Sequence, residues 1–436
     1  MNRNRVSPVL PPNVCLRQLK RLAKDLVKAR DRGDSGAHLV LRNLNRFTSA
    51  SDEQILAAEL SLNEAQYALA LHYGFSSWDA LKKHADALEA ERQAHPIQED
   101  PEGGRVILGF EKLDWGGSPQ RRANSVMESF AAILRAMGMD MPYERLMGIS
   151  GQAFRIQVAH EAFCPSAACS GPGFNTEDTA AQATGCPITW WNVEHADAPP
   201  DLDALGRAIA ESIDRGIPAL YCNEETSPIV GYRDSGKTLI LRDYFKCNVP
   251  DSGYTKAKKP AWVIGIVHPR PAPPDYAKTV VDSLRLAPRL ARTESFGTYH
   301  SGFRAWEVWI DRLRDGFTEG REIEFPEILG NWYPYASLVN ARHAGSLYLN
   351  DVARLFPGDA ENHLRKAAAL FNRLQESLHA RFDAVPAPWE LNETNPWTQA
   401  KRDTQAVTME SALDLERQAF SEIDTALKLI DPSGAQ

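Results

Sequence analysis

The chain has 436 residues, of which 43% are hydrophobic and 24% are charged. This length can hold two or three domains with their own cores, and the composition is ordinary for a soluble globular protein. A net charge of −8 and a pI near 5.8 argue against a general nucleic-acid-binding protein, which would carry a basic face.

Two further features of the sequence indicate where the protein works. The chain contains no run of about 18 apolar residues, so we expect no membrane span. Its six cysteines are scattered and form no C-x-x-C pair, so we expect neither a disulfide framework nor a bound metal. A reducing, cytoplasmic location is therefore predicted, and no motif for a cofactor is present.

Residues 1–94 are predicted to form a separate helical module. One amphipathic helix is expected over residues 16–30 and another over residues 37–47. Ser61 and Glu64 form a capping box that opens a third helix, and Ser77 caps a fourth. The expected role is docking or capping rather than catalysis. Residues 95–104 lose this periodicity and gather Pro, Gly and charge, which predicts a linker.

The centre of the chain is organised around a helix that begins at Ser125. Ser125 and Glu128 have the spacing of a capping box, and Gly138 supplies a C-terminal stop. The helix macrodipole favours an anion at the position of Ser125, which is where thiol enzymes place a nucleophile. Apolar residues recur at helical spacing and predict a buried face: Val126, Phe130, Ile133, Leu134 and Met137.

The rest of residues 105–270 mixes helices and strands. A short helix over 143–147, a turn at Gly148–Gly151 and an extended segment over 154–158 follow the central helix. Further helices are expected near 176–184 and 201–215, and strands near 188–193, 218–222, 229–232, 238–243 and 261–267. This order predicts an α+β domain in which helices pack on a mainly antiparallel sheet.

Residues 271–436 are predicted to form a helical bundle. Helical periodicity covers residues 275–290, 304–313, 335–356, 361–381 and 404–430. The core-facing positions in these segments are typical of bundle packing rather than of a cofactor site.

The central region resembles the papain-like superfamily. The likeness rests on Asn124-Ser125 through Gly138, on residues 146–155 (LMGISGQAFR), and on Ile229-Val-Gly-Tyr232 followed by Leu239-Ile-Leu-Arg-Asp243. More narrowly, it is similar to butirosin-biosynthesis protein H and to bacteriocin-processing cysteine peptidases. It covers about 150 residues, and the helical ends lie outside it apart from a loose likeness of the C-terminal bundle.

The resemblance implies acyl chemistry by a Cys at the start of the central helix, with a His as base and an Asp or Asn to orient it. Ser125 stands at the Cys position. The His is expected five or six residues before Gly231, where the chain has Glu225 and Thr226. Only Asp243 matches the orienting acid. Ser125 is more simply interpreted as a plain helix cap, and Asp243 can equally be a carboxylate at the end of a strand.

Other residues are candidates for ligand binding. Asn124, Gln152, Arg155 and Glu224 lie in or beside the matching segments, and Arg155 either binds an anionic ligand or forms a structural ion pair. Cys164 is a second candidate nucleophile, although cysteine more often packs as a small hydrophobe. The spacing of His160, Cys164, Cys169 and Cys186 does not match a zinc knuckle.

The leading hypothesis is a catalytically degenerate papain-like protein that binds a peptide or an acyl-carrier-type ligand. One alternative is a working acyltransferase on a thioester substrate. Another is a structural module that binds a protein partner through its helical ends. A base within hydrogen-bond reach of Ser125 would favour the enzyme.

Overall fold

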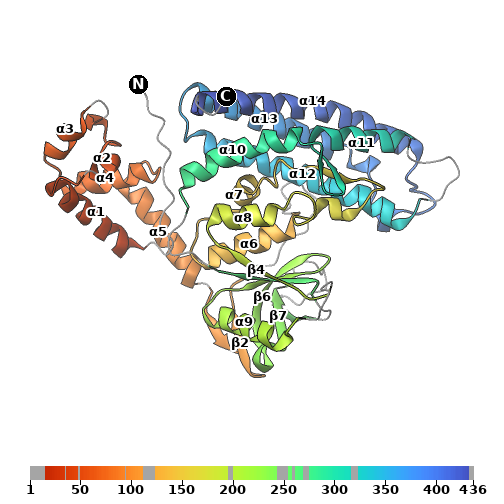
Figure 1. The fold of residues 1–436 in the computed structure, drawn as a ribbon, viewed down its shortest axis with the longest axis horizontal. Coiled ribbons are helices and arrows are strands. Elements are labelled where there is room, and N and C mark those ends of the chain that lie inside the picture. The colour runs from red at the N-terminus through yellow and green to blue at the C-terminus, as the bar shows by residue number, and fades with distance from the viewer. Residues whose placement is uncertain are drawn as a thin grey trace.

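The computed structural model describes residues 15–34, 36–47, 50–93, 95–110, 123–194, 200–242, 254–257, 261–268, 274–315 and 323–431. These residues form an α+β structure in which an antiparallel sheet lies below a long C-terminal bundle and an N-terminal helical module stands to one side (Figure 1). This confirms the predicted α+β class with an antiparallel sheet and helical flanks. Within the described residues, no helix is both long and apolar enough to cross a membrane.

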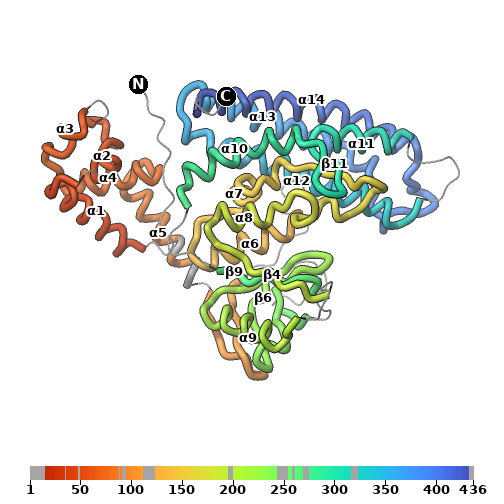
Figure 2. Tube along the Cα trace, in the orientation of Figure 1, coloured from red at the N-terminus to blue at the C-terminus, as the bar shows by residue number. Residues whose placement is uncertain are grey.

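The N-terminal module has its own cores. Its helices are α1 (Leu16–Asp31), α2 (Ala37–Leu41), α3 (Asp52–Ala57), α4 (Leu62–His72) and α5 (Trp78–Gln93), with a 3-10 turn η1 (Asn45–Phe47). Capping boxes at Ser51 and Ser61 fix the starts of α3 and α4, and the Ser77 hydroxyl accepts from Ala80 N at 3.1 Å. Two small apolar clusters hold these helices together. In Figure 2 the module stands to one side and reaches the rest of the protein through α5.

The segment 95–104 is not a free linker, so that prediction is wrong. It contains β1 (Ile97–Glu99) and the first residue of β2 (Gly104–Ile107), which pair as an antiparallel hairpin. β2 in turn pairs with β6, so the hairpin extends the central sheet. β1 is exposed along its whole length, which explains why its composition resembles that of a linker.

The central sheet is antiparallel and is built around β6 (Thr226–Arg233). Its order is β1-β2-β6-β5-β9-β4; off this path, β7 (Thr238–Arg242) also pairs with β6, and β8 (Tyr254–Lys256) pairs with β7. The remaining strands are β5 (Ala219–Cys222), β9 (Val263–Val267) and β4 (Ile188–Asn192). Gly231 permits the close approach of β2, because a Cβ there would lie 2.6 Å from the carbonyl oxygen of Arg105.

Four α-helices lie among the described residues of the central region. They are α6 (Ser125–Ala136), α7 (Tyr143–Ile149), α8 (Thr176–Thr184) and α9 (Leu202–Asp214), with a 3-10 turn η3 (Asp234–Gly236) before β7. α6 packs on β6 and lies between the sheet and the bundle (Figure 1). The predicted strand over 154–158 is shorter and later: β3 (Gln157–Ala159) joins a small sheet with β11 (Tyr299–Ser301) and β10 (Ser295–Phe296).

The C-terminal bundle consists of α10 (Tyr276–Arg292), α11 (Gly302–Asp315), α12 (Phe325–Ala353), α13 (Asp359–His379) and α14 (Gln399–Ile430). Short 3-10 turns η4 (Phe382–Ala384) and η5 (Pro388–Glu390) connect α13 to α14. α12 begins ten residues before the predicted start and runs through Pro334. Its other proline, Pro326, lies in the first turn, where a missing backbone N–H costs nothing.

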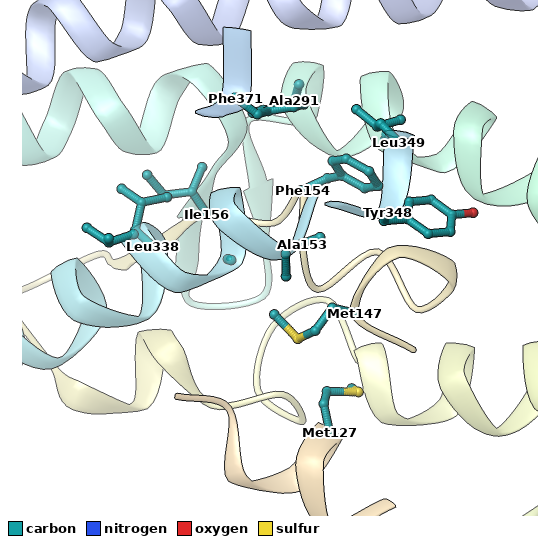
Figure 3. Packing of buried hydrophobic residues seen from close by; sticks show 14 of the residues in the cluster. Met127, Met147, Ala153, Phe154, Ile156, Ala291, Leu338, Tyr348, Leu349 and Phe371 are labelled. Carbon is teal, nitrogen blue, oxygen red and sulfur yellow. The ribbon is translucent and has the colours of Figure 1, made fainter. Parts of the chain in front are cut away.

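One apolar core joins the central helices to the bundle. Figure 3 shows Phe154 beside Tyr348 of α12, with Met147 of α7 and then Met127 of α6 below them. The Phe154 ring also contacts that of Phe371 of α13. The contact between α7 and α12 is tight, since a Cβ on Gly148 of α7 would lie 2.1 Å from the ring of Tyr348. Residues 105–270 and 271–436 therefore share a core, whereas the N-terminal module has separate ones.

Phe130 on α6 tests how much the shared core depends on this helix. Its side chain is buried in the core, so Phe130→Ala is expected to lower the free energy of unfolding by roughly 3–5 kcal/mol. Val407→Ala on the exposed face of α14 is the control and should change it by less than about 0.5 kcal/mol. Chemical denaturation of both variants measures the difference. A loss below about 1 kcal/mol for Phe130→Ala would mean that α6 is not central to the core.

Candidate functional site at the start of helix α6

The N-cap of α6 is Asn124, not Ser125. The Asn124 side-chain oxygen accepts from Met127 N at 2.9 Å, and Ser125 is the first residue of the helix. The predicted Ser125–Glu128 capping box is therefore wrong. Asn and Ser cap helices about equally well, so the local sequence does not decide between two adjacent candidates. The start and length of the helix were otherwise correctly predicted.

The Ser125 hydroxyl is used to hold α6 against the sheet. It accepts a hydrogen bond of 2.9 Å from the backbone N–H of Thr226, the first residue of β6. One helical turn later, the Ser129 hydroxyl donates to the carbonyl oxygen of the same residue at 3.0 Å. Ser125 is only 6% exposed and Ser129 is fully buried. Two serines at i and i+4 thus bind both backbone groups of one strand residue.

We call the two hydrogen bonds that join Ser125 and Ser129 to the backbone of Thr226 the tether. The tether lies where the resemblance expects a histidine, at residues 225 and 226. Thr226 meets Ser125 through its backbone amide, and the preceding Glu225 accepts a hydrogen bond of 3.2 Å from the Tyr333 hydroxyl of α12. Among the hydrogen bonds of the described residues, no imidazole or carboxylate reaches the Ser125 hydroxyl. Asp243, the predicted orienting acid, lies outside the described residues.

A buried polar network connects the other candidates. Asn124 Nδ2 donates to Ser170 Oγ at 3.0 Å, and the Thr176 hydroxyl lies 3.1 Å from the carbonyl oxygen of Ser170. That hydroxyl donates to Gln152 Oε1 at 2.6 Å, and the same oxygen accepts from Arg155 Nη1 at 3.3 Å. The structure therefore brings Asn124, Gln152 and Arg155 into one network, although the sequence separates them by about thirty residues.

The Arg155 guanidinium is committed to neutral acceptors within the protein. Besides Gln152 it donates to Gln157 Oε1 at 2.6 Å and to the carbonyl oxygens of Cys169 at 2.6 Å and Pro172 at 2.8 Å. Burial lowers its pKa to about 10, with partial compensation from Cys169 and Glu177. Arg155 thus organises the loop before α8. This bonding matches neither of the predicted roles, since its hydrogen-bond partners are neither an anionic ligand nor a carboxylate.

The thiols near this network are poor nucleophiles. Burial raises the pKa of Cys169 to about 11 and that of Cys222 to about 12. At neutral pH the thiolate fraction of Cys169 is then on the order of one in ten thousand, and that of Cys222 lower still. Cys164 is partly exposed, and its sulfur lies 2.8 Å from the hydroxyl of Ser166, which lies 2.8 Å from the Tyr299 hydroxyl. Glu224 is exposed in the β5–β6 turn.

Sequence reasoning did not identify Ser129, Ser170, Thr176, Glu177 or Thr226. One signal was available: Ser125 and Ser129 repeat at i, i+4 on the apolar face of a helix, which is a costly position for two unpaired hydroxyls. The pairing partner, Thr226, is about a hundred residues away and could not be identified from spacing.

The sequence was compared with protein-family models and with curated proteins, and it matches none of them.

Replacing Ser125 or Ser129 by alanine should lower the free energy of unfolding more than replacing a serine that makes only local hydrogen bonds. Ser125→Ala removes the acceptor of the buried Thr226 N–H, and Ser129→Ala removes the donor to its carbonyl, so each is expected to destabilise by about 1–3 kcal/mol. Ser411→Ala is the matched control, because the exposed Ser411 hydroxyl donates only to the carbonyl oxygen of Val407 in the same helix. This variant should change stability by less than about 0.5 kcal/mol. Equal stability of all three variants in urea denaturation would contradict the tether.

Glu177 should make stability depend on pH. Burial, with a smaller contribution from Asp178, raises its pKa to about 7 against the opposing effect of Arg155. Since the folded pKa exceeds the unfolded value of 4.5, its stabilising contribution is complete below pH 4.5 and is lost as the pH rises to 7. Glu177→Gln should remove this component, so the melting temperature of the variant relative to wild type should rise between pH 4.5 and 7.5. A constant difference across that range would show that Glu177 titrates normally.

Proposed function

We propose that this protein is a catalytically degenerate papain-like protein that binds a peptide or an acyl-carrier-type ligand without turning it over. The observation that carries the proposal is the hydrogen bond from the Thr226 backbone N–H to the Ser125 hydroxyl at 2.9 Å. A serine nucleophile needs a base that accepts its proton, and here the residue opposite Ser125 offers a donor instead. The high pKa values of Cys169 and Cys222 also argue against thiol chemistry.

A ligand-sized groove beside the polar network supports a binding role. It lies between α8 and α10 and has a volume of about 650 Å³, within the usual range for ligand sites. Its lining combines the apolar side chains of Leu286, Ile149 and Phe174 with five charged ones: Lys278, Arg285, Arg289, Asp275 and Asp282. These five sum to +1, and Lys278 and Arg285 both pair with Asp282, while Arg285 also pairs with Asp431.

This combination suits an acyl chain carried on an anionic group. Acyl-carrier ligands present a phosphate, an extended arm and an apolar chain, so a groove that carries both basic and apolar side chains matches their chemistry. α8 begins at Thr176, a member of the buried network, so the position of the α8 wall of the groove is fixed by the same contacts that order the start of α6.

Binding and turnover can be separated in one experiment with an octanoyl thioester of phosphopantetheine as the probe. The protein should bind the probe in isothermal titration without releasing thiol faster than buffer does. Arg289→Glu, at an exposed position on the groove, should weaken binding about tenfold, while Ser125→Ala should leave affinity and thiol release unchanged.

Lys20→Glu on α1 reverses a charge far along the chain from the groove and is the control for net charge. Thiol release that Ser125→Ala abolishes would overturn the degenerate assignment in favour of a working acyltransferase. Absence of binding by the wild-type protein would exclude the acyl-carrier ligand.

A further inference from the structure

A second surface carries a set of aromatic side chains that the fold does not need to bury. Trp389 in η5 is 64% exposed and Phe325 at the start of α12 is 57% exposed. Phe325 and Trp332 are seven residues apart on α12, which places them on the same face of the helix. Together with the neighbouring Tyr333, these side chains form what we call the aromatic platform: Phe325, Trp332, Tyr333 and Trp389.

Trp332 connects three rings of the platform. Trp332 and Trp389 meet edge to face with centroids 4.8 Å apart and planes at 74°, and Trp332 and Tyr333 lie 6.5 Å apart with planes at 26°. Large apolar side chains that stay together at a surface mark interaction sites, because leaving them in water forgoes the free energy of their burial. Trp and Tyr are also the residues that contribute most to protein interfaces.

The two chain segments that supply the platform are acidic. Residues 323–341 and 382–397, which supply it, contain no Lys, Arg or His, and Arg381 and Lys401 are the nearest bases flanking the second segment. Lys401 already donates to Asn395 Oδ1. The acidic side chains of the two segments are all exposed or partly exposed: Glu324, Glu327, Asp383, Glu390 and Glu393. This local charge of −5 compares with −8 for the whole chain.

The negative charge decides the kind of partner. A nucleic acid or an anionic membrane would be repelled by these carboxylates. A guanidinium or ammonium group is attracted to the faces of Trp and Tyr rings and pairs with carboxylates, and arginine does both in a planar geometry. The chemistry therefore favours an extended cationic peptide whose side chains lie on the rings while their charges meet the Glu residues of the two segments.

We propose that the aromatic platform is a docking surface for a Lys/Arg-rich peptide segment of a partner protein. The platform reaches the start of α6 through Tyr333, whose hydroxyl donates to Glu225 beside Thr226, so occupation of the platform is adjacent to the tether. The proposal does not depend on the papain-like ancestry or on the acyl-carrier groove, because it uses neither Ser125 nor the α8–α10 groove.

The test uses a fluorescein-labelled peptide of alternating Arg and Gly and measures fluorescence anisotropy with the full chain. The control peptide replaces each Arg by citrulline, which keeps the shape and removes the charge. The Arg peptide should bind at least about tenfold more tightly than the citrulline peptide at low salt, and the preference should shrink in 500 mM salt because exposed charges are screened.

Variants then locate the site. Trp389→Ala should weaken binding of the Arg peptide at least fivefold, and Trp389→Phe should retain most of it because an aromatic face remains. Trp262→Ala is the control, since Trp262 is also partly exposed (37%) but lies next to β9. Equal melting temperatures show that the variants are folded.

Three outcomes would overturn the proposal: no binding of the Arg peptide, equal binding of the citrulline peptide, or equal losses in Trp389→Ala and Trp262→Ala. Tighter binding of an uncharged Pro-rich peptide than of the Arg peptide would also overturn it, because the platform would then recognise backbone shape rather than cations.

Discussion

The buried ion pair between Arg342 of α12 and Glu416 of α14 is the interaction on which the arrangement of the central region depends. Arg342 is fully buried and Glu416 is 1% exposed, and their closest atoms are 2.5 Å apart. Removing two charges from water is costly unless every polar atom finds a partner. Glu416 Oε1 accepts a further hydrogen bond from Trp306 Nε1 at 3.1 Å. Arg342 Nη1 donates to the carbonyl oxygens of Ala153 at 2.8 Å and Arg155 at 3.2 Å.

Those last two bonds connect the bundle with the central region. Arg342 donates to the backbone carbonyl of Arg155. The Arg155 side chain in turn donates to Gln152 and to the carbonyl oxygen of Cys169, which precedes Ser170 in the same loop. Ser170 then bonds Asn124, the cap of α6. A continuous set of buried polar contacts therefore runs from the middle of α14 to Asn124 at the start of α6, in addition to the apolar core shown in Figure 3. The cap of α6 is thus connected to residues of the C-terminal bundle, while Ser125 itself bonds to β6.

Local signals predicted most of the elements, because periodicity and capping depend on neighbours in the sequence. The strands around β6 and the helices of the bundle were placed to within a few residues, apart from the start of α12, where two prolines concealed ten helical residues. The hairpin β1–β2 was missed because exposed edge strands have the composition of loops. The local sequence does not decide whether Asn124 or Ser125 caps α6, because the two residue types cap helices about equally well. In the structure the Ser125 hydroxyl bonds to Thr226, and Asn124 is the cap.

The candidate site was harder to predict than the fold because its character is set by nonlocal hydrogen bonds. A serine at the start of a helix resembles a nucleophile in sequence, yet a nucleophile must hand its proton to a base. Here the Ser125 hydroxyl accepts from the backbone N–H of Thr226, and Ser129 holds the same strand residue in place. Both bonds use the backbone of Thr226, so they depend on the helix–strand contact and not on the side chain at that position. Acyl chemistry at position 125 therefore requires a base to be supplied as well, not only the exchange of the serine for a thiol.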